Sequence, residues 1–453
     1  MRTSKLTEGK IWSTLLNFAI PFLMASLLQA LYGAADLFMV GQFADSAAVS
    51  AVASGSQIMQ TLTGVVLGIS TGGTVLIGRY IGAKDEEGAA RAVGTMCIVF
   101  AGLALLLTPL MTAASGGVVT LMQMPTEAVH YAKEYLFICS CGIPFIIGYN
   151  AVSGIFRGMG DSRTPVYFIA LACVVNVGLD YLLVARLHMA AAGAAAATIT
   201  AQAVSFLAAL FYMEKRGLSF PFGRRHLRFH TPSAVFIFKV GCPLALQDAL
   251  VNMSFLIITA IVNSMGVIAS ASVGVVEKIL GFAMLPPGAF SSAVATMTAQ
   301  NIGAGKPKRA LRGLQFGILY SLIFGVIVFV TAQITPETIT SIFTTDRLVV
   351  EGAARYFQSF SIDCMLVAFV FNMNAYFSGC GRSVISMVHS LLATFCVRIP
   401  VSYFVSRMEG STNEILRMLG FAVPMATAFS LAVCTVYFIW QKKRGNSNVD
   451  VIK

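Results

Sequence analysis

Charged residues are scarce in this chain. Only 11% of its 453 residues are Asp, Glu, Lys or Arg, whereas 57% are hydrophobic, so a soluble globular protein of ordinary composition is excluded. We expect an integral membrane protein, since about 20 consecutive apolar residues form one membrane-spanning helix. The first apolar run is too long for a cleavable signal peptide, and we expect it to remain as a helix.

Several chemical signatures are also missing. The chain has no GxxxxGK[ST] motif, which argues against a nucleotide-driven pump. Its five histidines are scattered, and we find neither a metal-ligand spacing nor a nucleophile triad. The nine cysteines are odd in number and mostly fall in apolar runs, so no disulfide framework is expected, and Cys139 and Cys141 are assigned to core packing. We therefore expect neither an enzyme nor a resident cofactor.

The apolar runs predict an all-α integral membrane fold with twelve transmembrane helices. The first six spans cover residues 12–40, 47–78, 90–114, 131–156, 164–187 and 190–213. The second six cover residues 232–265, 269–300, 310–333, 352–377, 384–406 and 412–441.

The placement of the basic residues predicts the orientation. The net charge of +11 is compatible with nucleic-acid binding, but most Lys and Arg residues fall on alternate connections between spans. The opposite connections hold only Lys133, Arg186, Arg347, Arg355, Arg407 and Arg417. By the positive-inside rule, both termini are expected in the cytoplasm and the chain in the cell (inner) membrane. The lipid bilayer, and no nucleic acid, is the expected partner.

The chain repeats itself after about 220 residues. Pro21 and Pro243 match at an offset of 222, and residues 81–84 (IGAK) match residues 302–306 (IGAGK). We therefore predict two six-helix lobes related by a pseudo-two-fold axis along the membrane normal, with a central cavity for alternating access. The predicted parts are an N-terminal lobe at 1–214, a cytoplasmic linker at 215–231 and a C-terminal lobe at 232–453.

These features together resemble the multidrug and toxic compound extrusion (MATE) transporters. The likeness rests on the two six-span halves, on residues 157–165 (RGMGDSRTP), and on the span-one pattern of Pro21, Gln29, Asp36 and Gly41. It covers nearly the whole chain, and its motifs are specific in combination. The resemblance implies a cation-coupled antiporter that exports organic, often cationic compounds, driven by inward flow of protons or sodium.

The resemblance also implies where the coupling ion binds. In the branch of the family whose ion site lies in the N-terminal lobe, the matching positions are Asp36, Asn176, Asp180 and Thr198, with Asn150 as an accessory polar residue. The other branch has acids on spans seven and ten, where this chain shows Asp248 and an acid-free stretch at 367–374. A second-lobe ion site is therefore not expected.

The residues support the first-lobe site independently. Away from their ends, the predicted first-lobe spans carry Asp36 and Asp180 and no Lys or Arg. At 1.5 Å per residue, Asp36 lies about 36 Å and Asp180 about 24 Å from the cytoplasmic starts of their spans, and Thr198 about 12 Å from the outer start of its span. Asn176 and Asp180 share a helix face. The missing partner is a proton, or a sodium ion held by carboxylate, amide and hydroxyl oxygens, unless the acids only line a wet vestibule.

The second lobe leaves two alternatives open. Glu277 either meets substrate or pairs with Lys278 or Arg398, which also lie inside predicted spans. We place Gln29, Glu277 and Asn374 at the substrate cavity, among Met and aromatic side chains that suit flat cations.

The sequence as a whole favours an antiporter that moves amphipathic organic cations outward as a monomer, with Pro21 as a hinge in span one. One rival is a flippase for lipid-linked precursors, which needs a cationic cavity that these spans do not provide. A membrane-embedded enzyme would need a catalytic cluster, and a channel would not need paired deep acids.

Overall fold

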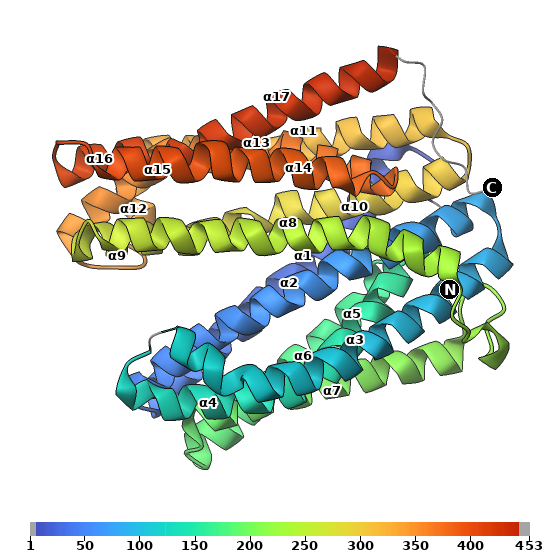
Figure 1. Ribbon diagram of the computed structural model, residues 1–453, viewed down its shortest axis with the longest axis horizontal. Helices are drawn as coiled ribbons and strands as arrows, with labels where there is room; N and C mark the ends of the chain where they lie inside the picture. The colour runs from blue at the N-terminus through green and yellow to red at the C-terminus, as the bar shows by residue number, and fades with distance from the viewer. Residues whose placement is uncertain (1–5, 123, 444–453) are drawn as a thin grey trace. The chain divides into compact units, whose positions relative to one another are not determined.

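The computed structural model describes residues 6–122 and 124–443, and within them it contains helices and no strand (Figure 1). The first half comprises α1 (Ile11–Phe43), α2 (Ser46–Ala83), α3 (Glu86–Leu121), α4 (Thr126–Cys141), α5 (Ile143–Gly158), α6 (Arg163–Asp180), the π-helix η1 (Tyr181–Arg186) and α7 (Ala190–Arg216). A 3₁₀ turn, η2 (Arg224–His226), lies before the second half.

The second half repeats this order of spans. It comprises α8 (Thr231–Asn263), α9 (Val267–Ala283), α10 (Leu285–Gly303), α11 (Pro307–Ile334), α12 (Pro336–Thr340), α13 (Arg347–Gly379), α14 (Ser383–Ala393), the π-helix η3 (Thr394–Arg398), α15 (Ile399–Ser406), α16 (Thr412–Leu419) and α17 (Ala422–Lys443).

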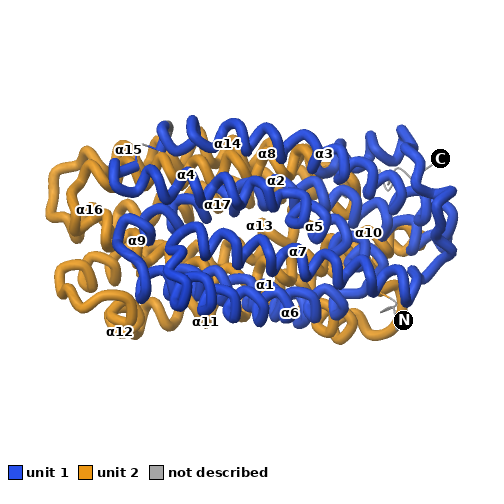
Figure 2. Tube along the Cα trace, turned by 90° about the horizontal axis from the view of Figure 1, so that it is seen from below, with its two compact units in different colours: residues 1–5, 20–241 blue, residues 6–19, 242–453 orange. Residues whose placement is uncertain are grey.

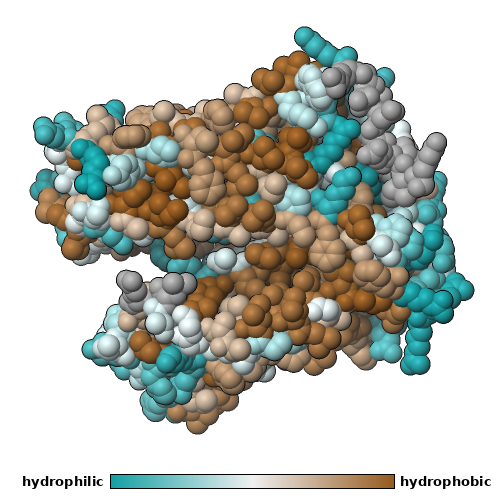
Figure 3. All heavy atoms as spheres, in the orientation of Figure 1, coloured by the Kyte–Doolittle hydropathy of each residue, from teal (hydrophilic) through white to brown (hydrophobic). Residues whose placement is uncertain are grey.

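The twelve predicted spans are confirmed. Eleven helices of the described residues are long and apolar enough to cross a membrane, and the pair α4 and α5, bent by 48°, makes the twelfth. The bend follows from Pro144 in the first turn of α5, because proline cannot donate the backbone hydrogen bond that would continue α4. Hydrophobic side chains cover the middle of the helices and hydrophilic ones gather at their ends (Figure 3), as expected for helices surrounded by lipid.

The chain divides into two compact units that do not separate at a single point (Figure 2). Unit 1 contains residues 20–241 and unit 2 contains residues 6–19 and 242–453. The first turns of α1 therefore belong to unit 2, and the first turns of α8 belong to unit 1. Pro21 and Pro243 are each the second residue after such a boundary. Helices α1 and α8 thus each pass from one unit to the other close to a proline inside the helix.

In unit 1, the first turns of α8 pack closely on α2. A Cβ atom at Gly72 would lie 2.2 Å from the Ile237 carbonyl oxygen, and one at Gly241 would lie 2.6 Å from Cα of Ile69. Glycine at these two positions allows the helix backbones to approach each other. The contact between α2 and α8 therefore depends on the absence of side chains at Gly72 and Gly241.

Arg79 extends the same contact. The sequence predicts the end of the second span at residue 78, but α2 continues to Ala83, so Arg79 lies inside the helix and is buried. Its guanidinium carbon stands 4.9 Å from the centre of the Phe236 ring on α8. A cation stacked on an aromatic face in this way is attracted by the negative face of the ring. The predicted end of the second span thus left out one buried basic residue of α2, Arg79.

In unit 2, the first turns of α1 pack on α10. Leu15, Phe18 and Ala19 share one buried cluster with Phe290 and Ala293. Helix α13 lies at the centre of this unit and contacts α9, α10, α11, α16 and α17. The start of α1 is thus held by apolar burial, which contributes about 25 cal/mol for each Å² of apolar surface.

The close approach of α2 and α8 generates a stability prediction. We expect Gly72→Ala to lower the free energy of unfolding by about 1–3 kcal/mol, because the added methyl would displace the α8 backbone at Ile237. The matched control is Gly64→Ala on the same helix, where nothing lies within 4 Å of the new Cβ. Thermal unfolding of the purified protein in detergent measures both. Equal stability of the two variants would contradict the packing described.

Candidate functional site

Helices α1, α6 and α7 bring three of the predicted site residues into direct contact within unit 1. The Asn176 amide Nδ2 donates to Asp36 Oδ1 at 2.9 Å, and the Thr198 hydroxyl donates to Asp36 Oδ2 at 2.8 Å. The Asn176 amide also lies 3.5 Å from the Thr198 hydroxyl oxygen. Asp36 is 6% exposed and Asn176 is 1% exposed. Both oxygens of the Asp36 carboxyl are therefore held by neutral donors from two other helices.

Asp180 completes the cluster as a second carboxyl. Its side chain is fully buried and interacts with the Asp36 carboxyl. Neither Asp180 oxygen accepts a hydrogen bond from a donor among the described residues. A buried carboxylate without a donor costs several kcal/mol unless a proton or a cation joins it.

The local backbone explains how α6 and α7 present these side chains. Asn176 and Asp180 are four residues apart and so lie on one face of α6. The α-helix ends at Asp180 and continues as the π-helix η1, a feature that often marks functional sites because the wider turn shifts the facing of later residues. His188 and Ala190 have positive φ angles in the turn to α7. That turn reverses the chain, so Thr198 on α7 reaches Asn176.

The electrostatics of the cluster are unusual because no basic side chain takes part. Among the described residues, the groups that hydrogen-bond to Asp36 are the Asp180 carboxyl, the Asn176 amide and the Thr198 hydroxyl, and no Lys or Arg interacts with it. Three buried oxygens stay without a donor there: Oδ1 of Asn176 and both oxygens of Asp180. This set of oxygens can hold a proton between the carboxyls or coordinate a hard cation.

Two further polar residues extend the cluster, and sequence reasoning missed them. The Gln202 amide donates to the Tyr32 hydroxyl at 3.1 Å, which joins α7 to α1 a second time. Tyr32 also interacts with the Asp36 carboxyl. The available signal was spacing, because Tyr32 precedes Asp36 by four residues and Gln202 follows Thr198 by four.

Two residues predicted for the first lobe lie differently. The Asn150 amide donates to the Ile146 carbonyl one turn earlier in α5, at 2.8 Å, and no hydrogen bond among the described residues joins it to the acids. Gln29 is exposed on α1 and interacts with the Tyr32 hydroxyl. Gln29 thus reaches the cluster through Tyr32, whereas Asn150 does not.

The acids of unit 2 form no comparable pair. Glu277 on α9 is exposed, with Thr259 as a hydrogen-bond partner and Lys278 as a charged neighbour. Within the described residues it makes no close ion pair with Lys278 or Arg398. The Arg398 guanidinium donates to the Ser254 hydroxyl at 3.2 Å and stacks on the Phe255 ring at 4.8 Å.

The Asp363 carboxyl is buried on α13, with Thr427 as a hydrogen-bond partner and Arg398 as a charged neighbour. A cation thus interacts with this acid, in contrast to Asp36 and Asp180. Asp248 on α8 is exposed.

Asn374 belongs to a separate buried network in unit 2. Its Oδ1 lies 2.7 Å from Nε2 of His389 on α14, and Nδ1 of the same ring lies 2.6 Å from the Ser430 hydroxyl on α17. Asn374 and His389 are both buried. The amide placed at the substrate cavity is therefore engaged in joining three helices.

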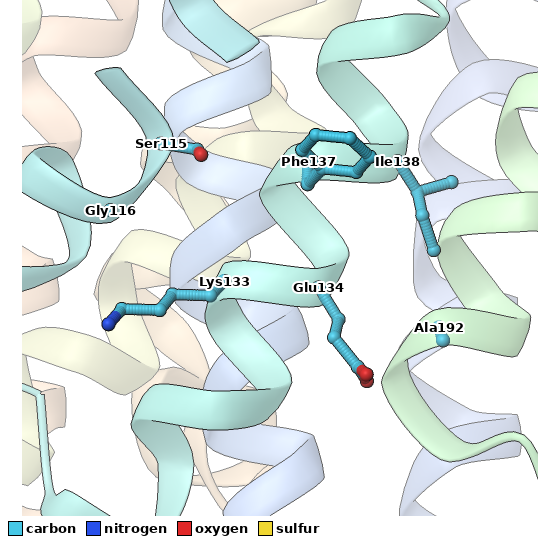
Figure 4. Close-up of a pocket in the computed structure, with 7 residues that line it drawn as sticks. All are labelled: Ser115, Gly116, Lys133, Glu134, Phe137, Ile138 and Ala192. Atoms are coloured by element: carbon cyan, nitrogen blue, oxygen red, sulfur yellow. The ribbon is translucent and has the colours of Figure 1, made fainter. Parts of the chain in front are cut away.

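A pocket of about 490 Å³ opens elsewhere in unit 1, between α3, α4 and α7 (Figure 4). Its lining includes Ser115, Lys133, Glu134, Phe137 and Ala192. The adjacent residues Lys133 and Glu134 leave α4 in different directions, with Glu134 on the side of Ala192. None of the predicted ion-site residues lines this pocket.

Comparison with known proteins places the chain among transporters. A family model described as MatE matches residues 21–182 and 243–404, which together make up more than half of the chain. The two matched segments begin at Pro21 and Pro243, so they coincide with the internal repeat.

Individual relatives cover nearly the whole chain. The "Probable multidrug resistance protein YoeA" of Bacillus subtilis is 27% identical, over 98% of this chain and 97% of its own length. The "Probable multidrug resistance protein NorM" of Thermotoga maritima is 25% identical, over 87% of this chain and 85% of its own length. A solved structure titled as the outward-facing conformation of a multidrug resistance MATE family transporter matches with a TM-score of 0.89 at 20% identity, over 98% of both chains. This structural likeness shows the fold.

The buried carboxyl pair generates a second stability prediction. At alkaline pH, where the pair has lost its shared proton, we expect Asp180→Asn to raise the unfolding temperature, because the amide removes one buried charge and can donate to Asp36. The gain should shrink at acidic pH, where a proton already joins the carboxyls. Thermal unfolding at several pH values measures it.

The matched control for this prediction is Asp161→Asn in the same unit. Asp161 accepts hydrogen bonds from the backbone N–H groups of Arg163 and Thr164 at the start of α6. Asn keeps an acceptor oxygen and caps a helix about as well as Asp, so this variant should change the unfolding temperature little. A lower unfolding temperature for Asp180→Asn at alkaline pH would refute an uncompensated carboxyl pair.

Proposed function

The chain belongs to the MatE family, and we propose that within it this protein is a cation-coupled antiporter of the branch whose ion site lies in the first lobe. It exports amphipathic organic cations by alternating access. The observation that carries the proposal is the contact of Asp36, Asn176 and Thr198 beside the buried Asp180 carboxyl. No basic side chain among the described residues interacts with that carboxyl pair, so an exchangeable cation is the group that it lacks.

A proton is the simplest partner for the pair. Shared between the Asp36 and Asp180 carboxyls, one proton supplies the donor that the Asp180 oxygens lack. Its arrival removes one negative charge from the pocket, and its departure restores an anionic site that attracts an organic cation. Substrate and proton thus compete for the anionic state of the carboxyl pair. This competition is required if one is to be exchanged for the other across the membrane.

Sodium fits the same donor set. Oδ1 of Asn176, the Asp180 oxygens and the Thr198 hydroxyl are hard oxygen ligands of the type that alkali and alkaline-earth cations prefer. Asp36 would supply the second negative charge. Either ion is cargo in the cycle, entering from outside and leaving toward the cytoplasm.

Pro21 is the proposed hinge of the cycle. It lies in α1 between the first turns, which belong to unit 2, and Asp36, which belongs to unit 1. Proline removes one helix hydrogen bond, so α1 can bend there at low cost. Neutralising Asp36 would then let the later turns of α1 repack. Both termini are proposed to lie in the cytoplasm of a cell whose inner membrane holds the protein.

Transport in liposomes tests the coupling. We expect purified protein to take up ethidium under an imposed proton or sodium gradient, and Asp36→Asn and Asp180→Asn each to reduce this uptake at least about tenfold, since each removes a carboxylate from the ion site. Asp363→Asn, which alters a buried acid of unit 2, is the matched control and should retain gradient-driven uptake.

The outcomes separate the alternatives. Uptake driven by one gradient alone names the coupling ion. Uptake that persists in both first-lobe variants but fails in Asp363→Asn would move the ion site to unit 2. No uptake of any organic cation by the wild type would favour the flippase.

Thr198 offers a finer test of the ion site. Thr198→Val keeps the shape but removes the hydroxyl that donates to Asp36 at 2.8 Å, so we expect about tenfold weaker affinity for the coupling ion. Thr198→Ser keeps the hydroxyl and should remain near wild type. The ion concentration that gives half-maximal uptake measures the affinity. Identical values for the valine and serine variants would exclude the hydroxyl from the site.

A further inference from the structure

A second pocket lies in unit 2, at the point where α1 and α11 begin. Its volume is about 570 Å³, and it is lined by residues 305–309, Arg312 and Ile11. Four of these residues, Lys306, Lys308, Arg309 and Arg312, are basic. Glu8 is the acid that interacts with Arg309, so one negative charge faces four positive ones. The pocket is strongly cationic.

Two of the four cations already have a structural task. The Lys306 ammonium donates to the Thr7 carbonyl at 3.1 Å, and the Arg309 guanidinium donates to the carbonyls of Leu6, Glu8 and Gly9. These bonds hold the stretch that precedes α1 against unit 2. The basic residues that remain for a ligand are therefore Lys308 and Arg312.

Lys308 and Arg312 are suited to hold an anion together. They are four residues apart on α11, so they lie on one helix face, and both are exposed. Within residues 6–122 and 124–443, neither side chain forms a hydrogen bond, an ion pair or a ring contact. An ammonium and a guanidinium at this spacing match the oxygens of a phosphate ester.

The same face of α11 continues as an apolar surface. Leu319 and Ile323 follow Arg312 by seven and eleven residues and are 48% and 49% exposed. The stretch from Arg312 to Ile323 measures about 16 Å along the helix. Trp12, next to the pocket residue Ile11, is also exposed, as aromatic side chains at membrane interfaces usually are. A cationic pocket thus leads into a strip that faces the acyl chains.

The repeat provides an internal comparison that a general preference for basic cytoplasmic loops does not explain. The first-half loop, residues 84–91, has Lys84 and Arg91 but also three acids at 85–87. The second-half loop, residues 305–312, has four basic residues and no acid. The two loops share their place in the fold, so the cationic character belongs to the second copy specifically.

We propose that this pocket binds the headgroup of an anionic phospholipid, with the phosphate between Lys308 and Arg312 and an acyl chain along Leu319 and Ile323. Basic pockets between transmembrane helices are established sites for such headgroups. The binding is reversible and non-covalent. A bound headgroup would also neutralise charge beside the stretch that anchors the start of α1.

Trp12 provides the signal for the test. The chain has two tryptophans, Trp12 and Trp440, so in a Trp440→Phe background the fluorescence comes from Trp12 alone. Full-length protein in nanodiscs of neutral lipid would be titrated with brominated phosphatidylglycerol and, separately, with brominated phosphatidylcholine. We expect the anionic lipid to quench Trp12 at a much lower mole fraction than the neutral one.

The variants assign the effect to the pocket. Lys308→Gln and Arg312→Gln should each raise the mole fraction for half-quenching about fivefold, and together more. Lys84→Gln with Arg91→Gln removes two charges from the first-half loop and should leave the titration unchanged. All variants are exposed positions, and equal unfolding temperatures would establish that folding is intact.

Three results would overturn the assignment. Equal quenching by the two lipids would show a pocket without charge selectivity. Unchanged quenching in the double variant of Lys308 and Arg312 would place the lipid elsewhere. Displacement of the brominated lipid by inorganic phosphate at the same concentration would show that the acyl chain contributes nothing, and the ligand would then be a soluble phosphate.

Discussion

The proximity of two buried carboxyls is the constraint on which the arrangement of unit 1 depends. Asp36 on α1 is satisfied by an amide from α6 and a hydroxyl from α7, but Asp180 has no donor among the described residues. A low-dielectric site cannot hold two ionised carboxylates next to each other without a compensating charge. The helices therefore form a site that favours a positive charge, and the neutral donors around Asp36 set the position of that site.

The carboxyl pair involves a helix, α1, whose residues belong to both units. The first turns of α1 are held in unit 2 by apolar contacts, and hydrogen bonds from Arg309 hold the residues just before α1, whereas Asp36 lies in unit 1. Helix α8 passes in the opposite direction, from unit 1 to unit 2. Gly72 and Gly241 permit the close contact that holds its first turns on α2. In both helices a proline follows the passage. A change of charge at Asp36 thus acts on a helix whose other end is anchored elsewhere.

Much of this arrangement was predictable from sequence because it depends on composition and spacing. Long apolar runs predicted the twelve spans, the matched motifs predicted two halves, and the spacing of Asn176 and Asp180 predicted a shared face. Tyr32 and Gln202 obey the same spacing rule but carry no charge. Arguments based on charged residues and their depth in the membrane therefore did not identify them. Which unit the start of α1 joins was not predictable, because it depends on contacts between residues far apart in the sequence, such as the Asn301 amide and the Leu6 carbonyl, which are 295 residues apart.

The internal repeat separates packing from chemistry. Residues retained in both halves, such as Pro21 and Pro243, shape helices and belong to the fold itself. Residues that differ between the two halves are not needed to shape the helices that the halves share. At the 222-residue offset, the positions of Asp36 and Asp180 are occupied in the second half by Ile258 and Ser402, both buried. One scaffold therefore tolerates either set of side chains, and the carboxyl pair cannot be explained by folding. The proposed exchange of a cation gives a reason for a carboxyl pair that the fold alone does not require.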